Sequence, residues 1–440
     1  MNLNTIKNQS GKMILQFSIP SIIAMVLTAL ITVTDGFFIG NYVGADGLAA
    51  VNLGLPIVYF YLAVGLMISV GGVAIAGMAL GSGDIRKSND VFNQTLCTTS
   101  VVAILTSVFV YFCLDPMLHF LHANAQIAVL FKAYYGMMLL ELPMMIINNS
   151  FGMFIRGEGK PAYFMKVNIL NVLINIVLDY LFVRWFQWGV SGIAFASLLA
   201  AVVTFFAILY FFFKKSEVFQ FSKFTFDRNV LKNTLCNGSS EFVGEISLCI
   251  SMFAYNFVIL KHIGVDGITA FTIVGYIAYL FSMVLIGFGQ GASPLMSFAY
   301  GAKDFETASK LRKITNLFVL SIGAALLLAM LFGANWYSGL FVKNECVVQM
   351  VRSGVTVYAV SFLFSGVNTI SSFYFTSIGK AMESAIISSA RGVVILLICI
   401  FTLPVLLGMT GVWLVAPMTE LLTLLISLFF IYREKKAISG

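Results

Sequence analysis

The chain has 440 residues, of which 60% are hydrophobic and only 10% charged, and its mean hydropathy is +0.95. About a quarter of the residues in a soluble domain are charged, so this composition excludes a soluble globular protein and indicates several membrane spans. The formal net charge of +7 comes from lysines and arginines concentrated in alternate loops. That is the positive-inside pattern of membrane proteins, and no nucleic-acid partner is expected.

Apolar runs of about 20 residues or more recur along the whole chain, which is the length that an α-helix needs to cross a bilayer. The runs do not alternate polar and apolar residues, so helices are favoured over barrel strands. The sequence therefore predicts an all-α integral membrane protein with twelve transmembrane helices. They are expected at 13–41, 48–80, 91–114, 126–155, 162–185, 189–213, 234–262, 267–300, 314–338, 350–376, 384–405 and 408–432.

The even number of spans places both termini on one side of the membrane. The basic loops indicate that this side is the cytoplasm, in a multi-pass protein of the cell (plasma or inner) membrane. The six cysteines are scattered without metal-type spacing, and they are expected to be small core residues.

Two halves of the chain repeat each other at an offset of about 220 residues. GADGLAA at 44–50 matches GVDGITA at 264–270, and GMALGSGD at 77–84 matches SFAYGAKD at 297–304. Further matches occur at the ends of later spans. Six spans per half return the chain to its starting side, so the halves should form two lobes related by a pseudo-two-fold axis along the membrane normal.

The repeat predicts a domain organisation with a cleft between two similar lobes. The expected parts are an N-terminal lobe over 1–213, a basic cytoplasmic linker over 214–233 and a C-terminal lobe over 234–440. Two such lobes suit alternating access, in which a central site opens to one side of the membrane at a time.

Carboxylates inside the predicted spans are the first chemical clue to function. An Asp at the centre of a membrane helix costs about 2.5–3.5 kcal/mol on insertion scales, and an unpaired buried carboxylate must take up a proton or hold a cation. Basic residues near the spans, such as Lys166 and Arg391, are expected near span ends, where they can reach the interface. The acids within spans are Asp35, Glu141, Asp179, Glu241, Glu245 and Glu420.

Four oxygen-bearing residues of the N-terminal half are expected at similar depth. Asp35 and Asp179 each lie about 9 Å below the outer end of their spans, and Ser197 lies roughly 12 Å below the start of its span. Asn175 precedes Asp179 by one helical turn, so the two share a face. This set could hold Na⁺, or the two carboxylates could share a proton. The alternative is that each side chain only caps or bonds a neighbouring helix.

The C-terminal half carries different acids. The repeat equivalents of Asp35 and Asp179 are Tyr255 and Cys399, so the cluster should be missing there. Instead, Glu241 and Glu245 lie four residues apart and share a helix face. Glu245 is the preferred candidate for a charge that faces substrate, and a solvated position near a span end is the alternative for both.

Two further acids stand beside prolines, which kink helices and free backbone carbonyls. Glu141 precedes Pro143, and Glu420 follows Pro417. A bend that faces the cleft and a purely structural role are both open interpretations of these positions.

These features together resemble the multidrug and toxic compound extrusion (MATE) family over essentially the full chain. The resemblance rests on the twelve-span, two-lobe pattern and on four motifs: PSIIAMVLTALITVTDGFFIGNYVGADGLAA (20–50), ALGSGD (79–84), RGEGKP (156–161) and NIVLD (175–179). It implies a transporter rather than an enzyme. The implied activity is efflux of amphipathic, often cationic drugs coupled to inward flow of H⁺ or Na⁺, with no cofactor and no metal other than possible Na⁺.

The resemblance also implies site residues. The family's N-terminal cation site corresponds to Asp35, Asn175, Asp179 and Ser197. Some members have a second cation site with an acid on span seven and another on span ten. Here span ten has no acid, and Asn368 is its nearest polar candidate, which puts a second site in doubt.

Two rival functions remain at this stage. A lipid-linked oligosaccharide flippase of the same superfamily would need a strongly basic central cavity, which the acidic spans disfavour. A membrane enzyme would need a cluster of histidines, metal ligands or a nucleophile with its base, and none is evident. The expected partners are small lipophilic cations, drugs and membrane lipids, and a monomer is expected.

Overall fold

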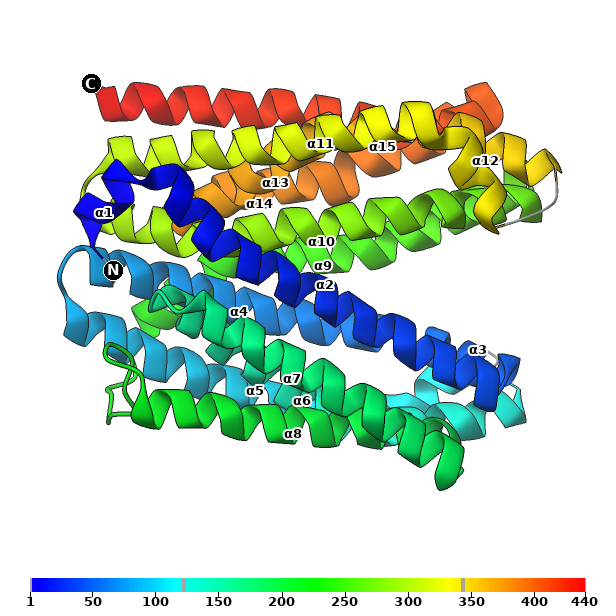
Figure 1. Cartoon of the computed structure of the whole chain (residues 1–440), viewed down its shortest axis with the longest axis horizontal. Coiled ribbons are helices and arrows are strands. Elements are labelled where there is room, and N and C mark those ends of the chain that lie inside the picture. Colours follow the sequence, from blue (N-terminus) through cyan, green and yellow to red (C-terminus); the bar gives the residue numbers. More distant parts are fainter. Residues whose placement is uncertain (1, 121–123, 342–344, 440) are drawn as a thin grey trace.

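The structure is a computed structural model that describes residues 2–120, 124–341 and 345–439 (Figure 1). Helices fill almost all of these ranges, and no strand occurs within them. The helices of the first half are α1 (Leu3–Asn8), α2 (Ser10–Tyr42), α3 (Ala45–Leu53), α4 (Leu55–Gly81), α5 (Ile85–Phe120), α6 (Ala125–Gly157), α7 (Pro161–Asp179) with the π-helical turn η1 (Tyr180–Trp185), and α8 (Gly189–Lys214). Those of the second half are α9 (Arg228–His262), α10 (Val265–Gly301), α11 (Phe305–Phe341), α12 (Glu345–Ala359), α13 (Ser361–Ser377), α14 (Ala381–Ser389) with the π-helical turn η2 (Ala390–Val394), and α15 (Ile395–Ser439).

The helices account for the twelve predicted spans. In the described part of the chain, ten helices are long and apolar enough to cross a membrane, and α12 with α13, bent by 45°, can form an eleventh crossing. The segment Ala381–Ala437 counts as one of the ten, but its 57 residues are about twice what one crossing requires. Its backbone leaves the helical conformation at Gly408 (φ 58°, ψ −136°), and Figure 1 shows α15 turning back. This segment therefore makes two crossings, which brings the total to twelve.

The helices form two lobes with similar architecture. Helices α3 to α8 make up one lobe in Figure 1 and α9 to α15 the other, while α2 runs along the boundary between them. Across that boundary, α2 packs on α10, and α4 packs on α9 and α10. Both termini lie at the same end of the helix bundle, as an even number of crossings requires (Figure 1).

Glycines allow helix backbones of the two lobes to touch toward the end that carries the termini. A Cβ atom on Gly71 of α4 would lie 2.0 Å from the Thr234 carbonyl oxygen, and one on Gly238 of α9 would lie 1.8 Å from the Met67 carbonyl oxygen. Such distances are far inside van der Waals contact. Any other residue would force the two helices apart, so these glycines permit the close contact of α4 with α9.

We expect Gly71→Ala and Gly238→Ala to destabilise this arrangement by about 1–3 kcal/mol each, the usual cost of overpacking. The apparent melting temperature of the detergent-purified protein should fall by several degrees. Gly136→Ala is the matched control, because a Cβ there meets nothing within 4 Å. Equal melting temperatures for all three variants would show that the contact between α4 and α9 does not depend on these glycines.

Candidate functional site

The first-lobe candidates come from three helices that converge in the half of the bundle away from the termini. Asp35 lies on α2, Asn175 and Asp179 lie on the last turns of α7, and Ser197 lies on α8. The carboxyl groups of Asp35 and Asp179 face each other within side-chain hydrogen-bonding reach. Asn175 donates from Nδ2 to Oγ of Ser197 at 3.0 Å. The structure therefore brings the predicted residues together as two adjoining pairs.

Four oxygens of this cluster have no donor. Oδ1 of Asp35, both carboxyl oxygens of Asp179 and Oδ1 of Asn175 are buried and accept no hydrogen bond from any described residue. Asp179 is fully buried, and no described lysine or arginine forms an ion pair with it or with Asp35. Because an ionised carboxylate carries no donor, two that face each other cannot satisfy one another, whereas a shared proton or a bound cation would satisfy both.

The backbone changes its winding directly after Asp179. The π-helical turn η1 (Tyr180–Trp185) follows α7 there, and the corresponding span of the second lobe contains η2 (Ala390–Val394). Single π-helical turns occur frequently at functional sites, because the extra residue per turn redirects the neighbouring side chains. At the repeat offset of about 220, η2 lies about ten residues earlier in its span than η1 does, so the two turns occupy different positions in the two lobes.

Glu141 of α6 lies close enough to Asp35 for their charges to interact. Its Oε2 atom is buried and has no donor among the described residues. Tyr134 lies two helical turns before Glu141 on α6. It is close enough to Asp35, Asp179 and Glu141 for electrostatic interaction. Sequence reasoning missed Tyr134, because one tyrosine in an apolar span carries no signal of its own.

A cavity of about 250 Å³ adjoins this region at Glu141. Glu141 lines it together with Thr28 of α2, Asn148 of α6, Tyr59 of α4 and Tyr279 of α10. Its other lining residues belong to the first half of the chain and Tyr279 to the second, so the cavity lies in the first lobe and reaches its boundary with the second.

A second cavity, of about 430 Å³, lies in the second lobe and also has Tyr279 in its wall. Glu241 and Glu245, one turn apart on α9, are partly exposed to it, and Glu420 lines it from α15. Three predicted acids therefore border one cavity, and Tyr279 joins it to the cavity beside Glu141. The two cavities lie next to each other across the boundary of the lobes.

The prediction that span acids lack cationic neighbours is wrong for Glu420. Arg391 was expected near a span end, but it lies in η2 and its Nε atom is 2.5 Å from Oε1 of Glu420. Asn368 donates from Nδ2 to Oε2 of Glu420 at 2.8 Å. Both carboxylate oxygens are therefore occupied by groups of the protein itself. A carboxylate whose two oxygens both accept hydrogen bonds, one of them from a guanidinium, needs no external proton or cation.

The second-lobe equivalents of the facing aspartates form an apolar contact. Tyr255 and Cys399 are each 7% exposed and belong to one hydrophobic cluster with Val258, Ile259 and Ile400. The repeat therefore places the same pair of positions together in both lobes. Only the first lobe uses carboxylates there, as the sequence predicted.

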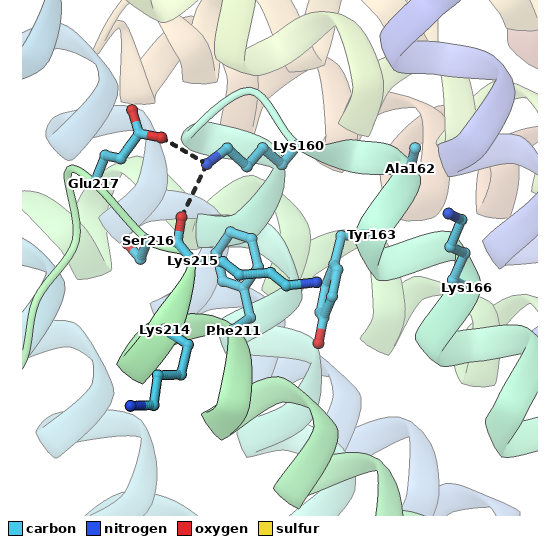
Figure 2. A pocket seen from close by; sticks show the side chains of 9 residues that line it. All are labelled: Lys160, Ala162, Tyr163, Lys166, Phe211, Lys214, Lys215, Ser216 and Glu217. Carbon is cyan, nitrogen blue, oxygen red and sulfur yellow. Dashed lines mark hydrogen bonds and ion pairs between the residues drawn. The ribbon is translucent and has the colours of Figure 1, made fainter.

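Another cavity, of about 640 Å³, lies away from the acids, at the start of α7 and the end of α8 (Figure 2). Four lysines surround it, but two of them already have partners. Lys160 donates to the Lys215 carbonyl at 2.9 Å and pairs with Glu217 at 3.3 Å, and the Lys215 ammonium lies 5.0 Å from the centre of the Tyr163 ring. This basic cavity belongs to the surface next to the segment that joins the halves.

One buried carboxylate anchors the start of that connecting segment. Glu158, 7% exposed, accepts from Oγ of Ser216 at 2.6 Å and from the Glu217 backbone N–H at 2.6 Å. We expect Glu158→Ala to cost about 1–3 kcal/mol, because these donors lose their partner. Limited proteolysis of the segment after α8 should become faster. The control is Glu217→Ala, whose side chain is 84% exposed, and equal cleavage rates for the two variants would contradict this role.

The comparisons with known proteins agree with this architecture. A model of the MatE family matches the chain twice, at residues 20–181 and 242–402, which together are most of the chain. The chain is 22% identical over 408 residues to the multidrug export protein MepA of Staphylococcus saprophyticus, covering 92% of this chain and 90% of that protein. MepA of Staphylococcus aureus is 22% identical over 431 residues, covering 97% and 94%.

Solved structures share the fold. A MATE multidrug resistance transporter in an outward-facing conformation superposes with a TM-score of 0.92 at 23% identity, covering 98% of this chain and 96% of that one. MATE in complex with MaD3S gives 0.93 at 23% identity, covering 100% and 99%. A transporter of the MOP superfamily from Pyrococcus furiosus, described as having a binding pocket of reverse polarity, gives 0.93 at 22% identity, covering 100% and 99%.

Proposed function

Because the chain belongs to the MatE family of multidrug transporters, we propose that it exports amphipathic, often cationic organic compounds in exchange for H⁺ or Na⁺. The observation that carries the proposal is the facing pair Asp35 and Asp179, whose buried oxygens have no donor. This pair lies beside Glu141, which lines the 250 Å³ cavity of the first lobe. A cation or proton site and a substrate cavity are thus neighbours in the first lobe.

In the proposed cycle, H⁺ or Na⁺ enters the Asp35–Asp179 cluster while the cleft is open to the outside. Oxygens of Asn175 and Ser197 complete the set of ligands when the ion is Na⁺, since Na⁺ takes oxygen ligands. Neutralising the two carboxylates alters the packing of α2, α7 and α8 and weakens the hold on a cationic substrate. Coupling follows because ion and substrate prefer different states of the lobes.

Substrate binding is assigned to the two cavities that share Tyr279. Glu241 and Glu245 supply negative charge and the tyrosines supply aromatic faces, a combination that attracts lipophilic cations. These acidic walls favour drug export over the rival flippase function, because a pyrophosphate group would need a basic cavity.

In the proposed orientation, the end that carries both termini and most basic loops faces the cytoplasm. The moving bodies are residues 1–213 and 234–440, joined by the linker 214–233. A monomer surrounded by lipid is the proposed functional unit, and no enzymatic activity is assigned to it.

Transport by the purified protein in lipid vesicles tests this function. Uptake of a fluorescent lipophilic cation is measured under an imposed pH gradient, an imposed Na⁺ gradient, both or neither. The proposal expects uptake driven by at least one gradient. Equal uptake under all four conditions, or none, would contradict cation-coupled export.

A further inference from the structure

The basic cavity at the start of α7 and the end of α8 carries more positive charge than the protein itself neutralises. The lysines that line it are Lys160, Lys166, Lys214 and Lys215. Lys160 is compensated, because it pairs with Glu217 at 3.3 Å and lies 3.9 Å from the buried Glu158. The other three ammonium groups form no ion pair with a described residue. The cavity therefore keeps a net positive charge that an anion can balance.

Two aromatic rings hold one of these free cations in place. The Tyr163 hydroxyl donates to the Ala207 carbonyl at 2.7 Å, which joins the start of α7 to the end of α8. The Lys215 ammonium lies 5.0 Å from the centre of the Tyr163 ring and 5.5 Å from that of Tyr210. Contact with ring faces positions an ammonium without neutralising it. The charge of Lys215 thus stays available to a ligand in the cavity.

The other two free lysines each begin an apolar stripe on the surface of the bundle. Lys166 lies one turn into α7 and Lys214 ends α8, and Figure 2 shows them on opposite sides of the Tyr163 ring. Residues that follow one another by three or four positions share a helix face. The residues at this spacing from the two lysines are exposed and apolar or aromatic: Leu170, Leu173 and Val177 on α7, and Tyr210, Phe206 and Val203 on α8. Charge and apolar surface are therefore continuous along both helices.

We propose that this cavity binds an anionic phospholipid. The lipid phosphate contacts the ammonium groups of Lys166, Lys214 and Lys215, and the acyl chains lie along the stripes of α7 and α8. Basic pockets between membrane helices on the cytoplasmic side are suited to anionic headgroups, which are concentrated in that leaflet. A soluble anion would use the lysines alone, whereas a lipid uses the lysines and the apolar stripes together.

This inference goes beyond export, because it assigns a binding site for a component of the bilayer. The bound lipid joins the ends of α7 and α8 next to the segment that connects the two halves. The same two helices carry Asn175, Asp179 and Ser197 of the candidate cation site. The lipid site and the cation site therefore share their supporting helices, although they lie at different depths.

Lipid binding to the purified full-length protein in neutral detergent tests the proposal. Native mass spectrometry gives the dissociation constant of the first lipid bound, for phosphatidylglycerol and for phosphatidylcholine with the same acyl chains. Both lipids contain a phosphodiester, but only phosphatidylglycerol has a net negative charge. The test variant is Lys166→Gln/Lys214→Gln/Lys215→Gln, in which all three side chains are exposed, so the fold should be retained.

The matched control is Lys12→Gln/Lys87→Gln/Lys313→Gln. These lysines are also exposed, lie near the starts of α2, α5 and α11, and are not part of the cavity lining. Both triple variants have the same net charge, so a difference between them reports position rather than overall charge.

The wild-type protein is expected to bind phosphatidylglycerol about tenfold or more tightly than phosphatidylcholine. The cavity variant should bind phosphatidylglycerol about tenfold to a hundredfold more weakly, as loss of three lysines near an anionic headgroup predicts. Its binding of phosphatidylcholine should stay unchanged, and the control variant should match the wild type. Equal affinity of the two variants for phosphatidylglycerol would overturn the inference. Displacement of the lipid by an equal concentration of glycerol phosphate would assign the site to a soluble anion and overturn it as well.

Discussion

Asp35→Asn should abolish cation-driven transport in lipid vesicles while the protein still inserts and purifies. Asparagine keeps the shape of the side chain but can neither take up a proton nor offer a negative charge to Na⁺. The facing carboxyl of Asp179 then loses the partner with which it shares the ion. Transport is expected to fall to the rate of empty vesicles, and Asp179→Asn should behave in the same way.

The control for these variants is Asp266→Asn, which removes an exposed carboxylate at the start of α10. That variant should transport at the wild-type rate. If Asp35→Asn retained gradient-driven uptake, the facing aspartates would have a structural role only. A loss of transport caused by misfolding would appear instead as aggregation in size-exclusion chromatography.

Glu241→Gln/Glu245→Gln should weaken binding of a lipophilic monocation by about tenfold to a hundredfold. The two carboxylates share one face of α9, interact with each other, and border the 430 Å³ cavity. Removing both leaves Glu420 as its only predicted acid, and that carboxylate is already paired with Arg391. One substrate cation held between the two carboxylates gains about 1.5–3 kcal/mol in total from them, which gives this range.

The affinity for tetramethylrhodamine methyl ester, a lipophilic monocation, is measured by fluorescence polarisation. It is compared among the wild-type protein, Glu241→Gln/Glu245→Gln and the control Asp266→Asn. Unchanged affinity in Glu241→Gln/Glu245→Gln would place the substrate cation elsewhere, with Glu141 the next candidate because it lines the adjoining cavity.

Much of the fold could be predicted because run length and repetition are properties of the sequence itself. Every predicted span lies within a helix or a bent helical unit of the described chain, and α5 (Ile85–Phe120) shows the usual error, extending past both ends of the predicted 91–114. Helical hydrogen bonds continue beyond the hydrocarbon, whereas hydropathy reports only the part inside it. Depth along the spans also placed Asp35 near Asp179.

Contacts between spans of the second lobe could not be predicted from the sequence. Arg391 lies ten residues beyond Ala381, which starts its helix, and its partner Glu420 lies on the next crossing after the turn at Gly408. Pairing between spans depends on how helices rotate about their axes, and apolar composition leaves that rotation open. For the same reason, no sequence pattern pointed to Tyr134 or Tyr279.

Ion release on substrate binding tests the central claim most directly. A lipophilic cation is added to the purified protein in weakly buffered detergent solution, and released protons or radioactive Na⁺ are counted. If Asp35 and Asp179 hold the coupling ion, the wild-type protein releases H⁺ or Na⁺, whereas Asp35→Asn/Asp179→Asn binds the compound and releases neither. Release of the same amount by the double variant would contradict the account.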